Sequence, residues 1–172
     1  MSRPLVDPDL AAVTAALLAA KARFVVIGGF AVIANNYVRA TEDVHFLIPD
    51  DVDNDHALDV ALTTLDARWI APDRPFAAGD LAGREHSRLW TKAGLVDLLR
   101  EGAAPLDFET VAANAHEADL GAGRFRVAGL SSLVAFKRLA GRPRDKADLE
   151  ELREIHGELP VDPLPGLDER PD

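Results

Sequence analysis

The glycine pair Gly28-Gly29 constrains the fold of this chain more than any other feature of its sequence. It follows residues 24–27, Phe-Val-Val-Ile, whose β-branched and aromatic side chains are typical of a strand buried on both faces. Residues 30–37 can form about two helical turns, and the apolar residues 44–48 predict a second strand. The sequence therefore predicts a strand, a glycine turn, a short helix and another strand in direct succession.

Two polar side chains accompany the second of these strands. Because side chains alternate in direction along a strand, Asp43 and His45 point to one face, and Val44 and Phe46 point to the other. A glycine turn lets backbone N–H groups approach a phosphate closely, and a helix that follows it presents its positive N-terminal end to an anion. These features together predict a nucleotide site.

Composition limits the class of protein. The 172 residues suit one domain, with 48% hydrophobic and 28% charged residues. We predict a single domain over residues 1–157 and an acidic, proline-rich tail over residues 158–172, poorly ordered or lying on a partner. The formal charge of −10 disfavours nonspecific DNA binding, although a local basic cleft is compatible with it.

The absence of cysteine excludes disulfides and thiolate zinc sites and is compatible with a reducing cytoplasm. No apolar run has the length of a signal-peptide core or of a membrane span. We therefore expect a cytoplasmic protein with no membrane contact.

Hydrophobic spacing and turn residues predict an alternation of helices and strands. The predicted helices cover residues 10–21, 30–37, 54–67, 108–115, 132–140 and 144–156. The predicted strands cover residues 24–27 and 44–48, a brief strand at Trp69, and two hairpins, 87–91 with 95–99 and 117–120 with 124–127. Short connections between such elements predict an α/β (α+β) fold, with a mixed sheet flanked by helices and a C-terminal helical pair.

Asp97 is the one acid within the apolar strand predicted at residues 95–99. A carboxylate is costly to bury there unless a charged group pairs with it. Two interpretations are open from the residues alone. Asp97 is either a strand-edge carboxylate held by an arginine or part of a functional site.

The order of these features resembles the polymerase-β-type nucleotidyltransferase superfamily. That family has Gly-Gly or Gly-Ser, a spacer of about ten residues, Asp-h-Asp on one strand (h apolar), and a third acid on a later strand. The resemblance implies that Asp43 and Asp97 hold Mg²⁺ or Mn²⁺. It also implies that Gly28 and Gly29 bind nucleotide phosphates together with Thr41.

The C-terminal segment that begins at Lys137 is similar to the signature of a bacterial branch of this superfamily, the AbiEii-like toxins. The resemblance implies that Lys137 contacts a nucleotide phosphate and that Arg142 and Asp145 shape the same pocket. The alternative is a solvated helix pair in which Asp145 and Asp148 balance the basic residues.

His45 departs from the pattern, because it stands at the second acidic position and offers a nitrogen in place of a carboxylate. Three interpretations are open. The site binds nucleotide but transfers poorly; or it is active with another metal or another acid, such as Glu42; or His45 is an introduced change that silences a harmful enzyme. The catalytic set implied by the resemblance is therefore Asp43, His45 and Asp97.

The resemblance implies transfer of a nucleoside monophosphate from a nucleoside triphosphate to RNA, transfer RNA included, or to a protein. It also implies a toxin with an antitoxin partner. The alternative function is a noncatalytic module that senses nucleotide or docks a protein. The remaining histidines show no metal-ligand spacing and are expected at the surface or at helix ends: His56, His86, His116 and His156.

Overall fold

The computed structural model describes residues 6–29, 31, 43–165, 167 and 168. The helices are α1 (Leu10–Ala19), α3 (Val52–Thr64), α4 (Phe108–Ala113), α5 (Leu130–Ala140) and α6 (Pro143–His156). The strands are β1 (Val25–Ile27), β2 (Asp43–Ile48), β3 (Arg68–Trp69), β4 (Arg74–Pro75), β5 (His86–Thr91), β6 (Gly94–Arg100), β7 (His116–Asp119) and β8 (Arg124–Val127). Within this described part, no helix has the length and apolar character needed to cross a membrane.

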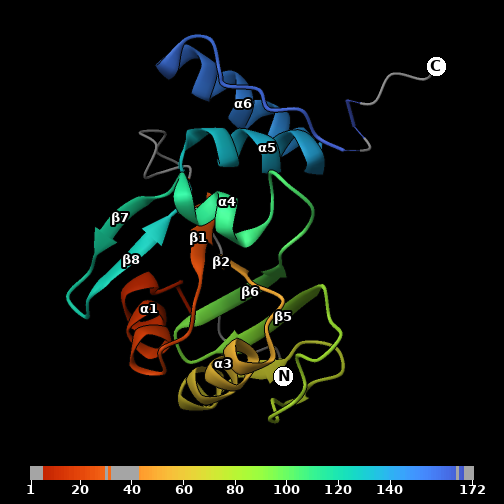
Figure 1. The fold of residues 1–172 in the computed structure, drawn as a ribbon. Coiled ribbons are helices and arrows are strands. Elements are labelled where there is room, and N and C mark those ends of the chain that lie inside the picture. Colours follow the sequence, from red (N-terminus) through yellow and green to blue (C-terminus); the bar gives the residue numbers. More distant parts are fainter. Residues whose placement is uncertain (1–5, 30, 32–42, 166, 169–172) are drawn as a thin grey trace.

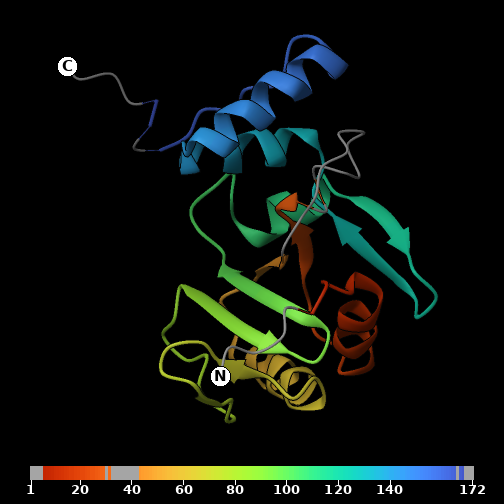
Figure 2. The same ribbon diagram turned by 180° about the vertical axis from the view of Figure 1, so that it is seen from behind.

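All eight described strands join one open sheet in the order β4-β3-β5-β6-β2-β1-β8-β7. The sheet is mixed, because β2 pairs in parallel with β6, β1 pairs in parallel with β8, and β1 pairs antiparallel with β2. Helices α1 and α3 lie together at one end of the molecule, and α5 and α6 lie together at the other (Figures 1 and 2). The predicted class, a mixed sheet flanked by helices with a C-terminal helical pair, is confirmed.

Local predictions differ from the structure at several element ends. Helix α5 begins at Leu130 after Gly129, two residues before the predicted start at residue 132. The extended backbone of Gly129 ends the preceding loop, and Ser131 lies inside the helix. Strand β4 contains a proline and is not among the predicted strands, but as the edge of the sheet it needs no second ladder of hydrogen bonds. The helix predicted at residues 30–37 lies almost wholly outside the described residues.

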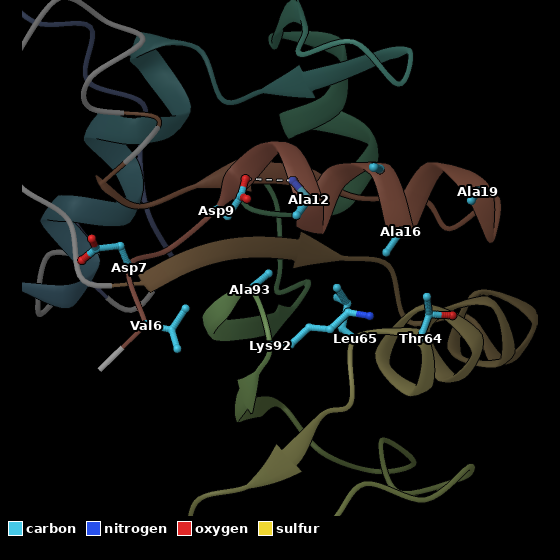
Figure 3. A pocket seen from close by; sticks show the side chains of 11 residues that line it. Val6, Asp7, Asp9, Ala12, Ala16, Ala19, Thr64, Leu65, Lys92 and Ala93 are labelled. Carbon is cyan, nitrogen blue, oxygen red and sulfur yellow. Dashed lines mark hydrogen bonds between the residues drawn. The ribbon is translucent and has the colours of Figure 1, made fainter. Parts of the chain in front are cut away.

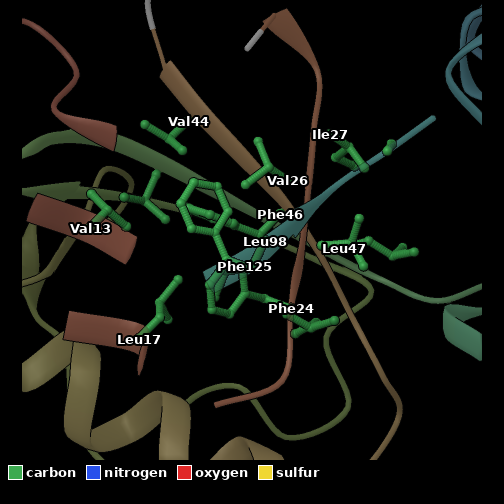
Figure 4. Packing of buried hydrophobic residues seen from close by; sticks show 14 of the residues in the cluster. Val13, Leu17, Phe24, Val26, Ile27, Val44, Phe46, Leu47, Leu98 and Phe125 are labelled. Atoms are coloured by element: carbon green, nitrogen blue, oxygen red, sulfur yellow. The ribbon is translucent and has the colours of Figure 1, made fainter. Parts of the chain in front are cut away.

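The core lies between the central strands and the helices α1 and α3. Phe24 packs edge-on against Phe46, with ring centroids 5.4 Å apart, and stacks on Phe125 at 6.2 Å. Val13 and Leu17 of α1 reach the same cluster (Figure 4). Burial of these large apolar side chains is the main term that holds β1 and β2 in the sheet.

A shallow groove of about 500 Å³ lies at the α1–α3 end of the molecule (Figure 3). Its wall is made largely of small side chains along α1, with Leu65 and Ala93 on the other side. Asp9 borders it and caps α1, because its Oδ1 accepts a hydrogen bond from the N–H of Ala12 at 3.0 Å. The groove is therefore an apolar hollow beside a helix start.

The described part of the predicted tail lies against the helical pair. Leu164 is 2% exposed and packs with Leu106 and Ala135. Arg138 donates hydrogen bonds to the Asp162 carbonyl oxygen at 3.0 Å and to Asp168 Oδ1 at 2.6 Å. These contacts hold the segment beside α5.

A buried cluster of charges joins α5 to α6. Lys137 is 5% exposed, and its Nζ lies 3.2 Å from Asp145 Oδ1 and 2.8 Å from Asp148 Oδ2. Asp145 also accepts from Arg142, whose Nε lies 2.7 Å from its Oδ2. Burial raises the pKa of the Asp145 carboxyl, but hydrogen bonds from Arg142 and Lys137 outweigh this effect and leave the pKa lowered.

The substitution Lys137→Met should therefore destabilise the fold. It removes the cation from two buried carboxylates, which costs about 3–5 kcal/mol in the free energy of unfolding. Urea denaturation followed by circular dichroism measures this cost. The matched control is Lys146→Met, at an exposed lysine of α6, which should change the free energy by less than about 0.5 kcal/mol. Equal stability of the two variants would show that the buried cluster does not hold the helices together.

Candidate functional site

Strand register brings three polar residues to one place on the sheet. In the parallel pair β2–β6, His45 is opposite Asp97, and in the antiparallel pair β5–β6, Arg88 is opposite Asp97. Residues directly opposite each other in a sheet project to the same face. Asp43 projects to this face as well, while Val44 and Phe46 are fully buried on the other face, as the alternation of β2 predicts.

The side chains of Asp43, His45 and Asp97 converge. Nε2 of His45 lies 3.0 Å from Asp43 Oδ2 and 2.7 Å from Asp97 Oδ2. One ligand atom from each residue lies within 4.8 Å of the others, so the three form a group that can hold a metal ion. The structure thus brings together the two carboxylates expected to bind metal and the histidine between them.

The glycine turn lies directly beside this group. Gly28 has a φ of +72°, and a Cβ atom there would lie 2.8 Å from His45 Cβ. A side chain at this position would therefore be strained and would collide with the imidazole. Gly29 is helical and buried. Thr41 and Glu42, the other groups proposed for this end of the site, lie outside the described residues.

Strand β5 contributes two residues that the sequence did not single out. His86, expected at the surface, has a side chain that is 55% exposed, yet its Nε2 lies 2.9 Å from Asp97 Oδ1. Arg88 has nitrogen atoms 3.5 Å from Asp43 Oδ2 and 3.6 Å from Asp97 Oδ2. The predicted hairpin, 87–91 with 95–99, would have set Leu89 opposite Asp97. The turn in the structure is shorter, with Thr91 opposite Gly94, and this register sets Arg88 opposite Asp97.

Whether a cation fits the site can be judged from the carboxylate oxygen Oδ2 of Asp97. Oδ2 is buried and, within the part of the chain that the structure describes, has no hydrogen bond. The hydrogen bond of His45 Nε2 goes to Asp43 Oδ2, and one N–H cannot point at both oxygens. A cation between the two carboxylates would contact both. The residues therefore fit a divalent metal with a donor set of two oxygens and one nitrogen, which suits Mn²⁺ or Zn²⁺ better than Mg²⁺.

The charges of this group influence one another strongly. Burial disfavours the imidazolium form of His45, but contacts with Asp43 and Asp97 outweigh burial and raise the pKa of His45 to about 9. Burial likewise raises the pKa of Asp43, and the hydrogen bond from His45 is the main effect that leaves it well below its usual range. Near neutral pH the metal-free site therefore contains an imidazolium between two carboxylates.

The opposite wall of the site comes from the helical pair. A cleft of about 430 Å³ lies between the sheet and these helices, and its lining includes His45, Asp97, Lys137, Arg142 and Asp145. The ammonium group of Lys137 is already engaged by Asp145 and Asp148. The Arg142 side chain is 64% exposed and bound to Asp145. The predicted phosphate-binding residues thus lie at the cleft, where their cations already have carboxylate partners.

No protein-family model matches the sequence, and no characterised protein in the comparison matches it. The structure of ANT(2'')-Ia in complex with adenylyl-2''-tobramycin is similar, with a TM-score of 0.56 and 12% identity over 84% of this chain and 86% of that one. The solution structure of the antibiotic-resistance factor ANT(2'')-Ia has the same TM-score and identity over 86% and 84%.

A third similar structure is an antigenic nucleotidyltransferase-like protein from Paracoccidioides brasiliensis, with a TM-score of 0.48 and 16% identity over 89% of this chain and 78% of that one. At these identities the similarity concerns the fold. The chain therefore shares its mixed α/β, nucleotidyltransferase-like fold with ANT(2'')-Ia.

Proposed function

We propose that this protein transfers a nucleoside monophosphate from a nucleoside triphosphate to an acceptor hydroxyl. The observation that carries the proposal is the convergence of Asp43, His45 and Asp97 on one point beside the Gly28 turn. In the reaction, the acceptor oxygen forms a bond to the α-phosphorus, the bond to the β-phosphate oxygen breaks, pyrophosphate leaves, and the acceptor proton passes to solvent.

Each group has a role that its position supports. Asp43 and Asp97 would hold a divalent metal, with His45 as the nitrogen ligand. When bound, such a metal neutralises triphosphate charge and orients the reacting groups. Backbone N–H groups of the turn at Gly28 and Gly29 would approach the phosphates. Arg142 reaches the cleft from the opposite wall with a largely exposed side chain, and Lys137 and Asp145 keep the start of α6 in position.

The acceptor proposed from the resemblance is RNA, including transfer RNA, or a protein, and the setting is a toxin with an antitoxin. The net charge of −10 disfavours extended RNA contact and favours a short or weakly charged acceptor. The similar structure of ANT(2'')-Ia contains an adenylylated small molecule. Labelled nucleotide offered together with transfer RNA, with protein extract or with hydroxyl-bearing small molecules would distinguish these acceptors.

A noncatalytic nucleotide-binding module is the second candidate, and one observation favours it. The imidazole of His45 lies between the two carboxylates, and its raised pKa gives it a positive charge near neutral pH. A charge at that point neutralises the carboxylates without a metal. In that state the site would bind a nucleotide but would lack the metal that transfer of a nucleoside monophosphate requires.

The substitution His45→Asp separates the two candidates. The parent protein should bind Mn²⁺ more tightly than Mg²⁺, and the aspartate should strengthen Mg²⁺ binding at least about tenfold, because an oxygen replaces the nitrogen and a negative charge is added. Calorimetry measures both affinities, and release of labelled pyrophosphate measures transfer.

Transfer by the parent protein with Mn²⁺ would establish the enzyme, and transfer by His45→Asp alone would identify a degenerate site. Asp119→Asn, on the exposed strand β7, is the control for surface charge and should match the parent. If neither protein binds nucleoside triphosphate with any divalent metal, the proposed function is wrong.

Metal affinity should also depend on pH in a defined direction. The proton on His45 must leave before its nitrogen binds metal, and the pKa of that group is raised to about 9. Affinity for Mn²⁺ should therefore be weakest at low pH, rise roughly tenfold per unit toward pH 9, and then level off. Calorimetry under anaerobic conditions measures this profile. His45→Asp should flatten it over the same interval, and a flat profile in the parent would exclude His45 as a ligand.

A further inference from the structure

Arg88 occupies an unusual position relative to the two carboxylates of the site. Its guanidinium bridges them, with one nitrogen 3.5 Å from Asp43 Oδ2 and another 3.6 Å from Asp97 Oδ2. These are the same two oxygen atoms that Nε2 of His45 approaches. A metal held by these oxygens would therefore lie close to a second, permanent positive charge.

The contacts of Arg88 are longer than those of the two cations that line the cleft, Lys137 and Arg142. Charge-assisted N–H···O bonds are typically about 2.7–2.9 Å long, and both Arg88 distances exceed this range. Lys137 and Arg142, in contrast, have carboxylate oxygens at 2.8 Å and 2.7 Å. Release of Arg88 from its partners thus costs less than release of either cation on the helical pair.

The strand register fixes the backbone of Arg88, and its side chain is partly exposed. Register holds its Cα opposite Asp97, while the side chain is 45% exposed. Asp97, one of its two carboxylate partners, lines the cleft, so rotation about the side-chain bonds can turn the guanidinium from the carboxylates toward a ligand held there. An arginine offers a planar pair of donors that matches a phosphate group.

We propose that Arg88 is a phosphate-binding residue that exchanges partners when a metal–nucleotide complex binds. Without metal, its guanidinium helps to neutralise Asp43 and Asp97. With metal on these carboxylates, the guanidinium turns to nonbridging oxygens of the triphosphate. The proposal rests on the proposed function, since it requires a metal and a polyphosphate at this site.

This exchange predicts effects of opposite sign when Arg88 is replaced. Arg88→Gln removes a positive charge beside the metal, so Mn²⁺ alone should bind at least about threefold more tightly. The same change removes the phosphate contact, so inorganic triphosphate in the presence of Mn²⁺ should bind about tenfold more weakly. Inorganic triphosphate is the probe because it contains no base or sugar that could bind elsewhere.

Calorimetric titration of each variant, first with Mn²⁺ and then with triphosphate at saturating Mn²⁺, measures both effects. Arg88→Lys keeps the charge but not the planar donor pair, so it should retain the parent Mn²⁺ affinity and lose part of the triphosphate affinity. The matched control is Arg124→Gln, because Arg124 is an exposed strand arginine whose ion pair with Glu117 is also 3.6 Å long. It should change neither affinity.

The outcomes separate this proposal from the proposed function. If Arg88→Gln weakens both affinities, the arginine has a structural role and the proposed exchange is wrong. If it changes neither affinity, Arg88 does not take part in binding metal or triphosphate, and the proposed exchange is wrong as well. In both cases metal and triphosphate binding by the parent would leave the proposed function standing. A parent protein that binds neither Mn²⁺ nor triphosphate would overturn both proposals.

Discussion

The burial of Asp97 in the middle of the sheet is the constraint on which the site depends. The residue is 2% exposed, and an unpaired carboxylate at that depth would cost several kcal/mol. Nε2 of His86 lies 2.9 Å from one oxygen of Asp97, and Nε2 of His45 lies 2.7 Å from the other. The pairing of this buried carboxylate therefore depends on the strand register. A shift of one residue in either neighbouring strand would turn a partner of Asp97 to the other face of the sheet.

The two walls of the cleft deal with charge in the same manner. On the sheet side, His45 and Arg88 offset Asp43 and Asp97; on the helical side, Lys137 is held by a pair of buried aspartates. Among the residues that the structure describes, the ion pairs of each wall close within that wall. Separation of the helical pair from the sheet would therefore leave the ion pairs within each wall intact.

The sequence predicted the elements whose pattern is local. The strands around the glycine turn, the hairpin that contains Asp97 and the C-terminal helical pair all follow from hydrophobic spacing and turn residues. The register between β2 and β6 does not, because these strands are far apart in the chain and a single sequence does not record which residues face each other. His86 and Arg88 were not singled out for a different reason: the hairpin turn was predicted one residue too long, which changes the residues that face Asp97.

The surroundings of the basic residues in α5 and α6 are a second feature that the sequence alone did not predict. Basic residues near a glycine and a proline suggested phosphate contacts and, as the alternative, a solvated pair of helices balanced by aspartates. The side chain of Lys137 is buried between α5 and α6, where it pairs with Asp145 and Asp148, and it also lines the cleft. Whether a lysine faces solvent, a ligand or a buried acid depends on how two helices pack, and the periodicity of each helix alone does not contain that information.

Strand β6 lies between β5, which precedes it directly in the chain, and β2, which is far away in the chain. This placement affects the order in which the strands can pair. The hairpin β5–β6 has only a short turn to close, whereas β2 must dock from a remote part of the chain. His86 and Arg88 both stand on this hairpin and can reach Asp97 as soon as it closes. His45 reaches the carboxylate only when β2 docks, so the buried acid has partners of its own hairpin before its partner from the distant strand arrives.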